Sequence, residues 1–234
     1  MNPVSQSKLQ AHQATLLVAA LASLLLWTIP FFGLVLLPLQ YLNTHIHEFS
    51  HAFVAILTGG QVDTIHVYSN GSGVTLIAGG SPLLTNSAGY LGATIIGGLI
   101  IVFSRTEKGA GLTMRAIACL LLFSFVFWVR GDIVGLVSGV AWIALLFALP
   151  AKIRGRNLVF LAQFIGMQQC LESLQALYVQ FKVSAYPVEI GSDAGNMAQF
   201  TGVPAMFWAV LWGAIGLGVL FVTLRFAWRN PPAA

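Results

Sequence analysis

The sequence predicts an all-α polytopic membrane protein, with about seven transmembrane helices and a short β-hairpin after the second of them. The first observation is composition: 57% of the 234 residues are hydrophobic and only 8% are charged, whereas soluble domains carry about 25% charged residues. The second is that apolar stretches of about 20 residues, the length that crosses the hydrocarbon core, recur along the chain. The third is one Val- and Thr-rich stretch with the pattern of strands. Together they predict a single membrane-embedded domain over residues 1–234.

Residues 14–58 predict the first two helices. They are apolar except near their end, and at about 1.5 Å per residue they are too long for a single crossing. Pro30 and Pro38 are the expected breaks. The run after Lys8 resembles a signal peptide, but it continues past Pro30 without a small-residue cleavage site, so we interpret it as the first membrane span. The second helix, at about residues 34–58, carries the sequence HEFSH.

Residues 61–78 predict a β-hairpin. This stretch is rich in Val, Thr, Ile and Tyr, and its apolar and polar residues alternate loosely. Asn70 and Gly71 divide it, and Asn-Gly is a favoured pair for a two-residue hairpin turn. The hairpin therefore follows directly on the helix that carries HEFSH.

Five further apolar stretches predict transmembrane helices, and they lie at about residues 82–104, 112–129, 133–150, 157–181 and 203–227. In the first of them, small residues recur four positions apart, which favours close packing between helices. The stretch at 157–181 is the most polar, because it carries several Gln residues and Glu172. It should therefore face a polar cavity or the membrane interface rather than lipid.

The net charge of +4 does not predict a nucleic-acid partner, because the basic residues sit singly or in small groups between apolar stretches. They gather in alternate loops and near the C-terminus: Arg105 to Arg115, Lys152 to Arg156, and Arg225 with Arg229. Such loops are typically cytoplasmic, and with seven spans the N-terminus would lie on the opposite side. We expect a multi-pass integral protein of the cell membrane, in contact with the lipid bilayer.

The sequence HEFSH places His47 and His51 four residues apart, so on a helix both imidazoles share one face. Two imidazole nitrogens so placed can bind a zinc ion at about 2.0–2.1 Å. Glu48 then lies beside the ion, where it can act as a general base on an activated water. A purely structural polar cluster is the alternative, but three such ionisable side chains are costly in an apolar helix. The motif therefore favours hydrolysis at a zinc ion.

The segment THIHEFSHAFVAILTGG, followed by the hairpin and by SAGYLGATIIGG, resembles the site-2 protease family of intramembrane zinc metalloproteases, in particular its small bacterial-type members. The matched stretch covers about residues 34–104. The resemblance implies one zinc ion per chain, His47 and His51 as ligands, Glu48 as the base, and an Asp from a later helix or loop as third ligand. It also implies that the substrates are transmembrane or juxtamembrane segments of other membrane proteins.

The third ligand departs from the family pattern, because the usual Asn-Pro and Leu-Asp-Gly signature is absent from this chain. Catalytic zinc usually has three protein ligands and a water, and the sequence GSDAGN, within the segment at about residues 186–200, offers Asp193. The alternative role of Asp193 is an N-cap, since Asp is favoured there. Glu172 is the second candidate for the third ligand. His45, two residues before His47, points to another side of the helix and is expected to pack.

Three residues are candidates for substrate binding. An open strand edge of the hairpin can hold an extended peptide by β-augmentation, which makes Asn70 and Gly71 candidates. Asn86 can hydrogen-bond an extended peptide or an oxyanion. Its alternative is a cap of the helix that begins after Pro82.

Two other classes of function fit parts of the sequence. A non-proteolytic metal-binding membrane scaffold would keep the zinc ligands, but it would have little use for a base beside the metal. An aspartyl intramembrane protease would use Asp132 and Asp193 as paired carboxylates. Asp132 lies close to Arg130, however, and suits an ion pair in a loop.

Overall fold

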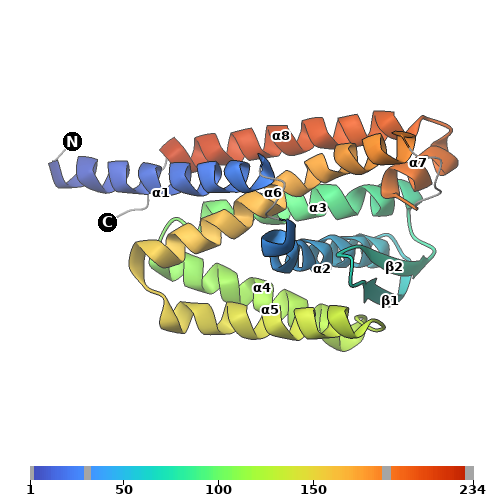
Figure 1. Ribbon diagram of the computed structural model, residues 1–234, viewed down its shortest axis with the longest axis horizontal. Coiled ribbons are helices and arrows are strands. Elements are labelled where there is room, and N and C mark those ends of the chain that lie inside the picture. The colour runs from blue at the N-terminus through green and yellow to red at the C-terminus, as the bar shows by residue number, and fades with distance from the viewer. Residues whose placement is uncertain (1–2, 29–32, 186–190, 230–234) are drawn as a thin grey trace.

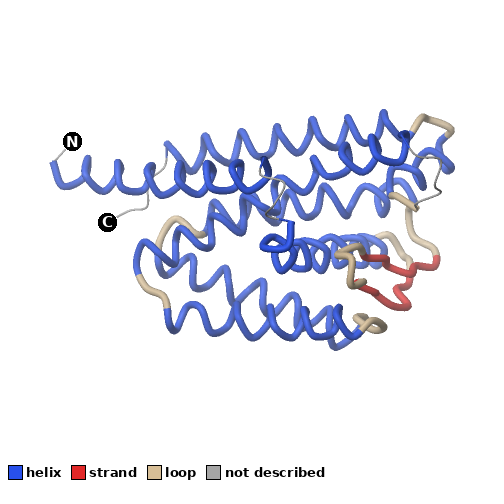
Figure 2. The backbone as a smooth tube through the Cα atoms, viewed as in Figure 1, coloured by secondary structure: helices blue, strands red, loops and turns tan. Residues whose placement is uncertain are grey.

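The computed structural model describes residues 3–28, 33–185 and 191–229 (Figure 1). Within these ranges the chain forms, in order, α1 (Pro3–Thr28), α2 (Gly33–Leu57), β1 (Gln61–Val67), β2 (Gly73–Ala78), α3 (Pro82–Phe103), α4 (Glu107–Phe127), α5 (Ile133–Lys152), α6 (Gly155–Ala185), α7 (Asp193–Thr201) and α8 (Ala205–Arg229). Helices dominate, and the two strands form one antiparallel hairpin (Figure 2). The helical class and the hairpin after the second helix are therefore confirmed.

The turn of the hairpin differs from the predicted one. The strands pair up to Val67 opposite Gly73, and between them the Gly71 N–H donates to the Tyr68 carbonyl (2.9 Å). Gly71 has a φ of 84°, whereas Asn70 does not have a positive φ. A two-residue Asn-Gly turn requires positive φ at both residues. The chain therefore reverses through a longer loop, in which only the glycine adopts the left-handed conformation.

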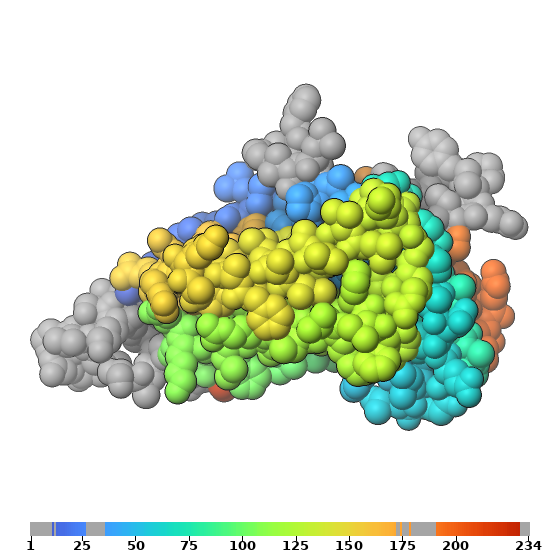
Figure 3. Space-filling view, turned by 90° about the horizontal axis from the view of Figure 1, so that it is seen from below, coloured from blue at the N-terminus to red at the C-terminus, as the bar shows by residue number. Residues whose placement is uncertain are grey.

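The helices form a bundle that encloses α2. α3, α6 and α8 pack on one another on one side of α2, and α4 pairs with α5 on the other side (Figure 1). The hairpin and the short α7 lie at one end of the bundle, where both strands contact α2. Figure 3 shows α4, α5 and the start of α6 covering one face, with the hairpin segment, in cyan, at its edge.

Four of the described helices, α3, α4, α5 and α8, are long and apolar enough to cross a membrane, and α1 contains a shorter apolar stretch, Gln13–Leu26. The expected count of about seven spans is therefore not confirmed. α2 and α6 are long enough, but they are not apolar enough to be counted, because they carry many polar residues. The bundle encloses these residues. Every residue from Tyr41 to Ala52 in α2 is buried. In α6, Gln163, Gln168 and Gln169 are buried, so these side chains face the protein interior.

The basic loops lie at the end of the bundle opposite the hairpin. These are the α3–α4 connection and the α5–α6 connection, and α8 ends on the same side (Figure 1). α1 also begins at this end. Seven complete crossings would instead place the start of α1 at the end opposite the basic loops. The difference arises because α1 ends near the middle of the long axis, where α2 begins.

The start of α5 accounts for Asp132. Its carboxylate accepts a hydrogen bond from the Val134 N–H (2.7 Å) and caps the helix. The expected ion pair with Arg130 is not found in the described structure, because that guanidinium donates to backbone carbonyls, the nearest being its neighbour Val129 (2.7 Å). Asp132 thus has a local structural role, which gives no support to a pair of catalytic aspartates.

Candidate metal centre

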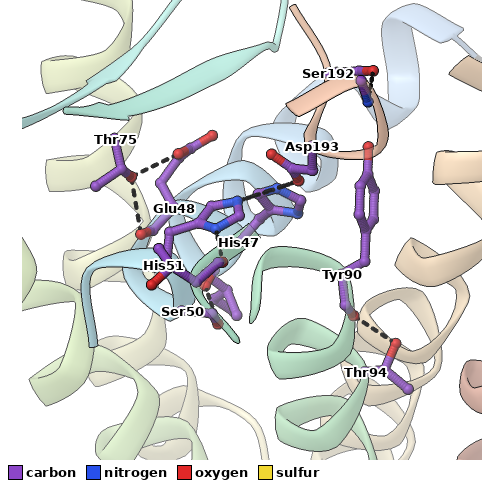
Figure 4. Close-up of polar contacts among 12 residues, drawn as sticks. His47, Glu48, Ser50, His51, Thr75, Tyr90, Thr94, Ser192 and Asp193 are labelled. Carbon is purple, nitrogen blue, oxygen red and sulfur yellow. Dashed lines mark hydrogen bonds and ion pairs between the residues drawn. The ribbon is translucent and has the colours of Figure 1, made fainter. Parts of the chain in front are cut away.

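The HEFSH sequence lies in the enclosed part of α2. His47, Glu48 and His51 keep only 9%, 5% and 6% of their surface exposed. The helical spacing turns both imidazoles to the same side, and their Nε2 atoms lie 3.0 Å apart (Figure 4). The two histidines are therefore brought together as the sequence predicts.

Asp193 reaches the same point from the other end of the chain. Its Oδ2 lies 3.0 Å from His47 Nε2 and 3.3 Å from His51 Nε2 (Figure 4). The predicted alternative, an N-cap role, is wrong, because Ser192 occupies the cap and accepts a hydrogen bond from the Gly195 N–H (3.0 Å). Asp193 is the first residue of α7, and its carboxylate points to the histidines.

These three side chains could hold a metal ion. One ligand atom from each of His47, His51 and Asp193 lies within 4.8 Å of the others. Ligands at about 2.0–2.1 Å in a tetrahedral site are about 3.3 Å apart, which is close to the separations of 3.0 and 3.3 Å seen here. Three protein ligands with one open position are typical of catalytic zinc.

Neighbouring groups act on His51 and Asp193, two of the three candidate ligands. The His51 Nδ1–H donates to the Thr85 carbonyl on α3 (2.6 Å), so the lone pair of the neutral ring is on Nε2 and faces the site. Burial alone would raise the pKa of Asp193, but the adjacent imidazoles of His51 and His47 hold this pKa below its usual value. The carboxylate is therefore ionised, as a metal ligand must be.

Gly89 of α3 allows the close approach of this helix to the site. A Cβ built on Gly89 would overlap the Nε2 atoms of both His47 and His51. The next residue, Tyr90, places its ring edge-on to His47, with centroids 4.6 Å apart, and stacks on Trp212 of α8. The sequence indicated only helix packing for this small-residue segment. It could not show that the two imidazoles of His47 and His51 fill the space beside Gly89.

Glu48 points away from α3 and towards the hairpin. Its Oε2 accepts a hydrogen bond from Thr75 Oγ1 on β2 (2.7 Å; Figure 4). Two residues earlier on the same face of β2, a Cβ on Gly73 would lie 2.6 Å from Glu48 Oε1, so only glycine leaves room for this oxygen. Sequence reasoning missed both residues. Alternation places residues 73 and 75 on one face of the strand, but no local signal shows which face meets α2.

The predicted substrate-binding residues have separate positions. Asn70 Oδ1 accepts from the N–H of Ser72 (3.0 Å) in the hairpin turn, and the Gly71 carbonyl accepts from Thr44 Oγ1 of α2 (2.6 Å). Asn86 lies inside α3, so its alternative role as a cap is wrong, because Ser81 occupies the N-cap. Gly71 thus anchors the hairpin to α2, the helix that carries HEFSH.

Two other candidates do not join the described site. His45 is buried on the opposite side of α2, where its Nε2 lies 3.2 Å from Ser138 Oγ on α5, in agreement with the expected packing role. Glu172 belongs to α6, and its side chain falls outside the described part of the structure.

Fold and site define a helical membrane protein with a buried His-His-Asp centre and an adjacent glutamate. The sequence profile of the family described as Peptidase M50B-like matches residues 15–223. The chain therefore belongs to this family of membrane-embedded metalloproteases, and the resemblance to site-2 proteases is confirmed. No curated protein and no solved structure matches the chain.

Proposed function

We propose that this protein is an intramembrane zinc endopeptidase, which hydrolyses peptide bonds in transmembrane or juxtamembrane segments of other membrane proteins. The convergence of His47, His51 and Asp193 beside Glu48, inside an apolar helical bundle, carries the proposal. Family membership supports the metalloprotease class. The choice of substrate rests on the burial of the site among membrane-crossing helices.

Each residue has a defined task in this reaction. His47, His51 and Asp193 would hold the zinc ion, and the Thr85 carbonyl orients the His51 ring. When bound, zinc polarises the substrate carbonyl and lowers the pKa of water towards about 7. The Glu48 carboxylate accepts a proton from the attacking water and delivers it to the leaving amine nitrogen. One peptide bond and one water thus become a carboxylate and an amine.

The hairpin offers an edge for an extended substrate. On the outer side of β1, the Ile65 N–H donates to the Trp128 carbonyl (2.9 Å), and the Ile65 carbonyl accepts from the Arg130 N–H (2.9 Å). In an antiparallel pair, the backbone groups of opposed residues point in opposite directions at such positions. Thr75, opposite Ile65, therefore directs its N–H and C=O to the outer edge of β2, where the described structure shows no backbone partner. A substrate strand added there would lie beside Glu48.

Glu48→Gln tests the proposal. The purified protein is reconstituted in lipid nanodiscs with a single-span membrane reporter that carries a different tag at each end. Glu48→Gln should lower reporter cleavage by about 100-fold or more while zinc content stays unchanged, because the carboxylate acts on water and is not a ligand. Equal cleavage by the wild type and Glu48→Gln would contradict a peptidase mechanism that uses this base.

A further inference from the structure

The Glu48 carboxylate is held from the hairpin, not from its own helix. Among the described residues, Thr75 is the side chain that donates a hydrogen bond to it (2.7 Å to Oε2). The same hydroxyl lies 3.1 Å from the Glu48 backbone carbonyl. Because a hydroxyl has a single proton, the charged carboxylate is the favoured acceptor. The position of this buried carboxylate therefore depends on a residue of β2.

The space around the carboxylate fits this arrangement. Gly73 leaves room for one oxygen, since a Cβ at this residue would lie 2.6 Å from Glu48 Oε1 and 2.7 Å from Thr44 Cγ2. Thr75, on the same face of the strand, binds the other oxygen. β2 thus provides a gap and a donor at neighbouring positions, which together select one orientation of the carboxylate.

The backbone of Thr75 faces a different direction from its side chain. Its N–H and C=O point to the outer edge of β2, because the opposed residue Ile65 bonds outward to the 128–130 segment. A peptide that pairs with this edge would bond to the backbone of the residue whose hydroxyl holds the base. One residue therefore connects the strand edge with the catalytic carboxylate.

We propose that Thr75 is a positioning residue, which sets the Glu48 carboxylate for proton transfer and couples its position to an extended substrate on β2. This inference rests on the proposed peptidase function. Without the hydroxyl, the carboxylate would keep its burial but lose its donor, and it could adopt other rotamers. Misplacement of a catalytic group by about 1 Å lowers rates by roughly 100-fold.

The test compares substitutions that keep or remove the hydroxyl. Thr75→Val preserves the branched shape and removes the donor, whereas Thr75→Ser preserves the donor. Thr64→Val on β1 is the matched control, because Thr64 is half-buried in the same hairpin and its hydroxyl contacts His66 rather than Glu48. Thr75→Val should lower kcat for the single-span reporter by roughly 10- to 100-fold with KM and zinc content unchanged. Thr75→Ser and Thr64→Val should stay within about threefold of the wild type.

A binding measurement gives a second readout that does not depend on hydrolysis. Acetohydroxamic acid chelates zinc, and a correctly placed carboxylate accepts its acidic proton. Its affinity for the zinc-loaded protein should fall about 10-fold in Thr75→Val and at least as much in Glu48→Gln, and it should be unchanged in Thr64→Val. If Thr75→Val does not retain zinc, Thr75→Ser and Thr75→Ala form the comparison, and only Ser should keep the affinity.

The results separate this inference from the proposed function. Equal reporter cleavage by the wild type and Glu48→Gln would refute the peptidase mechanism, whatever the Thr75 variants do. Loss of kcat in Glu48→Gln with unchanged kcat and unchanged hydroxamate affinity in Thr75→Val would refute only the positioning role. Equal losses in Thr75→Val and Thr75→Ser would also overturn it, because a retained hydroxyl would then not preserve the rate.

Discussion

The helices α2 and α5 pack on each other in one bundle, yet α5 exposes large apolar side chains whereas α2 buries ionisable ones. α5 is apolar enough to cross a membrane and leaves large side chains uncovered, with Ile133 74% and Val137 62% exposed. α2 carries histidines, a glutamate and hydroxyl residues, and it is enclosed from Tyr41 to Ala52. Helices that face lipid are therefore recognised by hydropathy, whereas the helix that carries the site is marked by polarity that the bundle must cover.

The polarity of α2 is balanced by hydrogen bonds to its neighbours. Buried polar groups in an apolar environment are costly unless they find partners. His51 pairs with the Thr85 carbonyl of α3 (2.6 Å), and Glu48 pairs with Thr75 of β2 (2.7 Å). The elements around α2 thus both stabilise its polar side chains and orient them for chemistry.

The strongest test of the contrast in stability uses one substitution on each helix. Leu42 of α2 is fully buried, whereas Leu145 of α5 is 43% exposed on the outside of the bundle. Leu42→Ala should lower the free energy of unfolding by about 2–5 kcal/mol, because it leaves a cavity in a packed region. Leu145→Ala should change it by less than about 1 kcal/mol. Thermal unfolding in detergent measures both, and equal losses would show that α2 is no better enclosed than α5.

A second substitution sharpens the comparison at the metal centre. Gly89→Ala should weaken zinc binding by about 10- to 100-fold, the range for groups that orient metal ligands, because the new Cβ would overlap both imidazoles. Gly218→Ala in α8 is the control, since a Cβ there meets nothing within 4 Å. Zinc affinity is measured by competition with a chelator. Wild-type zinc affinity in Gly89→Ala would show that the close approach of α3 is not needed for zinc binding.

The smallest effect on zinc binding is expected from substitutions that report only on the orientation of the protein in the membrane. In a variant without native cysteines, Asn157→Cys and Ser72→Cys are both at exposed positions, at opposite ends of the bundle. Neither should alter zinc content. The basic loops predict that Asn157→Cys reacts with an impermeant maleimide only after permeabilisation, whereas Ser72→Cys reacts in intact cells. The reverse pattern would place the hairpin end in the cytoplasm.

The sequence predicted those parts of the site that depend on local spacing. His47 and His51 share a helix face wherever the helix lies, so their pairing follows from four residues of separation. The prediction of Asp193 as a ligand came from the family resemblance, and the alternative was an N-cap role. Ser192, one residue earlier, occupies the N-cap instead. The Asp193 carboxylate therefore does not cap α7 and lies beside the two histidines.

Other features depend on packing between distant segments. Thr75 and Gly89 contact Glu48 and the two imidazoles because particular faces of β2 and α3 meet α2. No local sequence pattern predicts which faces meet. The hairpin was predicted from its composition, but its turn type was not, because Asn70 lacks the positive φ of a two-residue turn. The count of about seven spans is not confirmed, because the polar residues of α2 and α6 keep these two helices out of the set that is apolar enough to cross a membrane.

The zinc content of purified Asp193→Asn, compared with that of Asp132→Asn, tests the central claim most directly. Asn caps helices about as well as Asp, so Asp132→Asn should keep the structure and about one zinc per chain, as should the wild type. Asp193→Asn keeps the size of the side chain but removes the ionised ligand, and it should lose the zinc under the same chelator wash. Retention of one zinc with wild-type affinity in Asp193→Asn would contradict the His47, His51 and Asp193 centre and make Glu172 the next ligand to test.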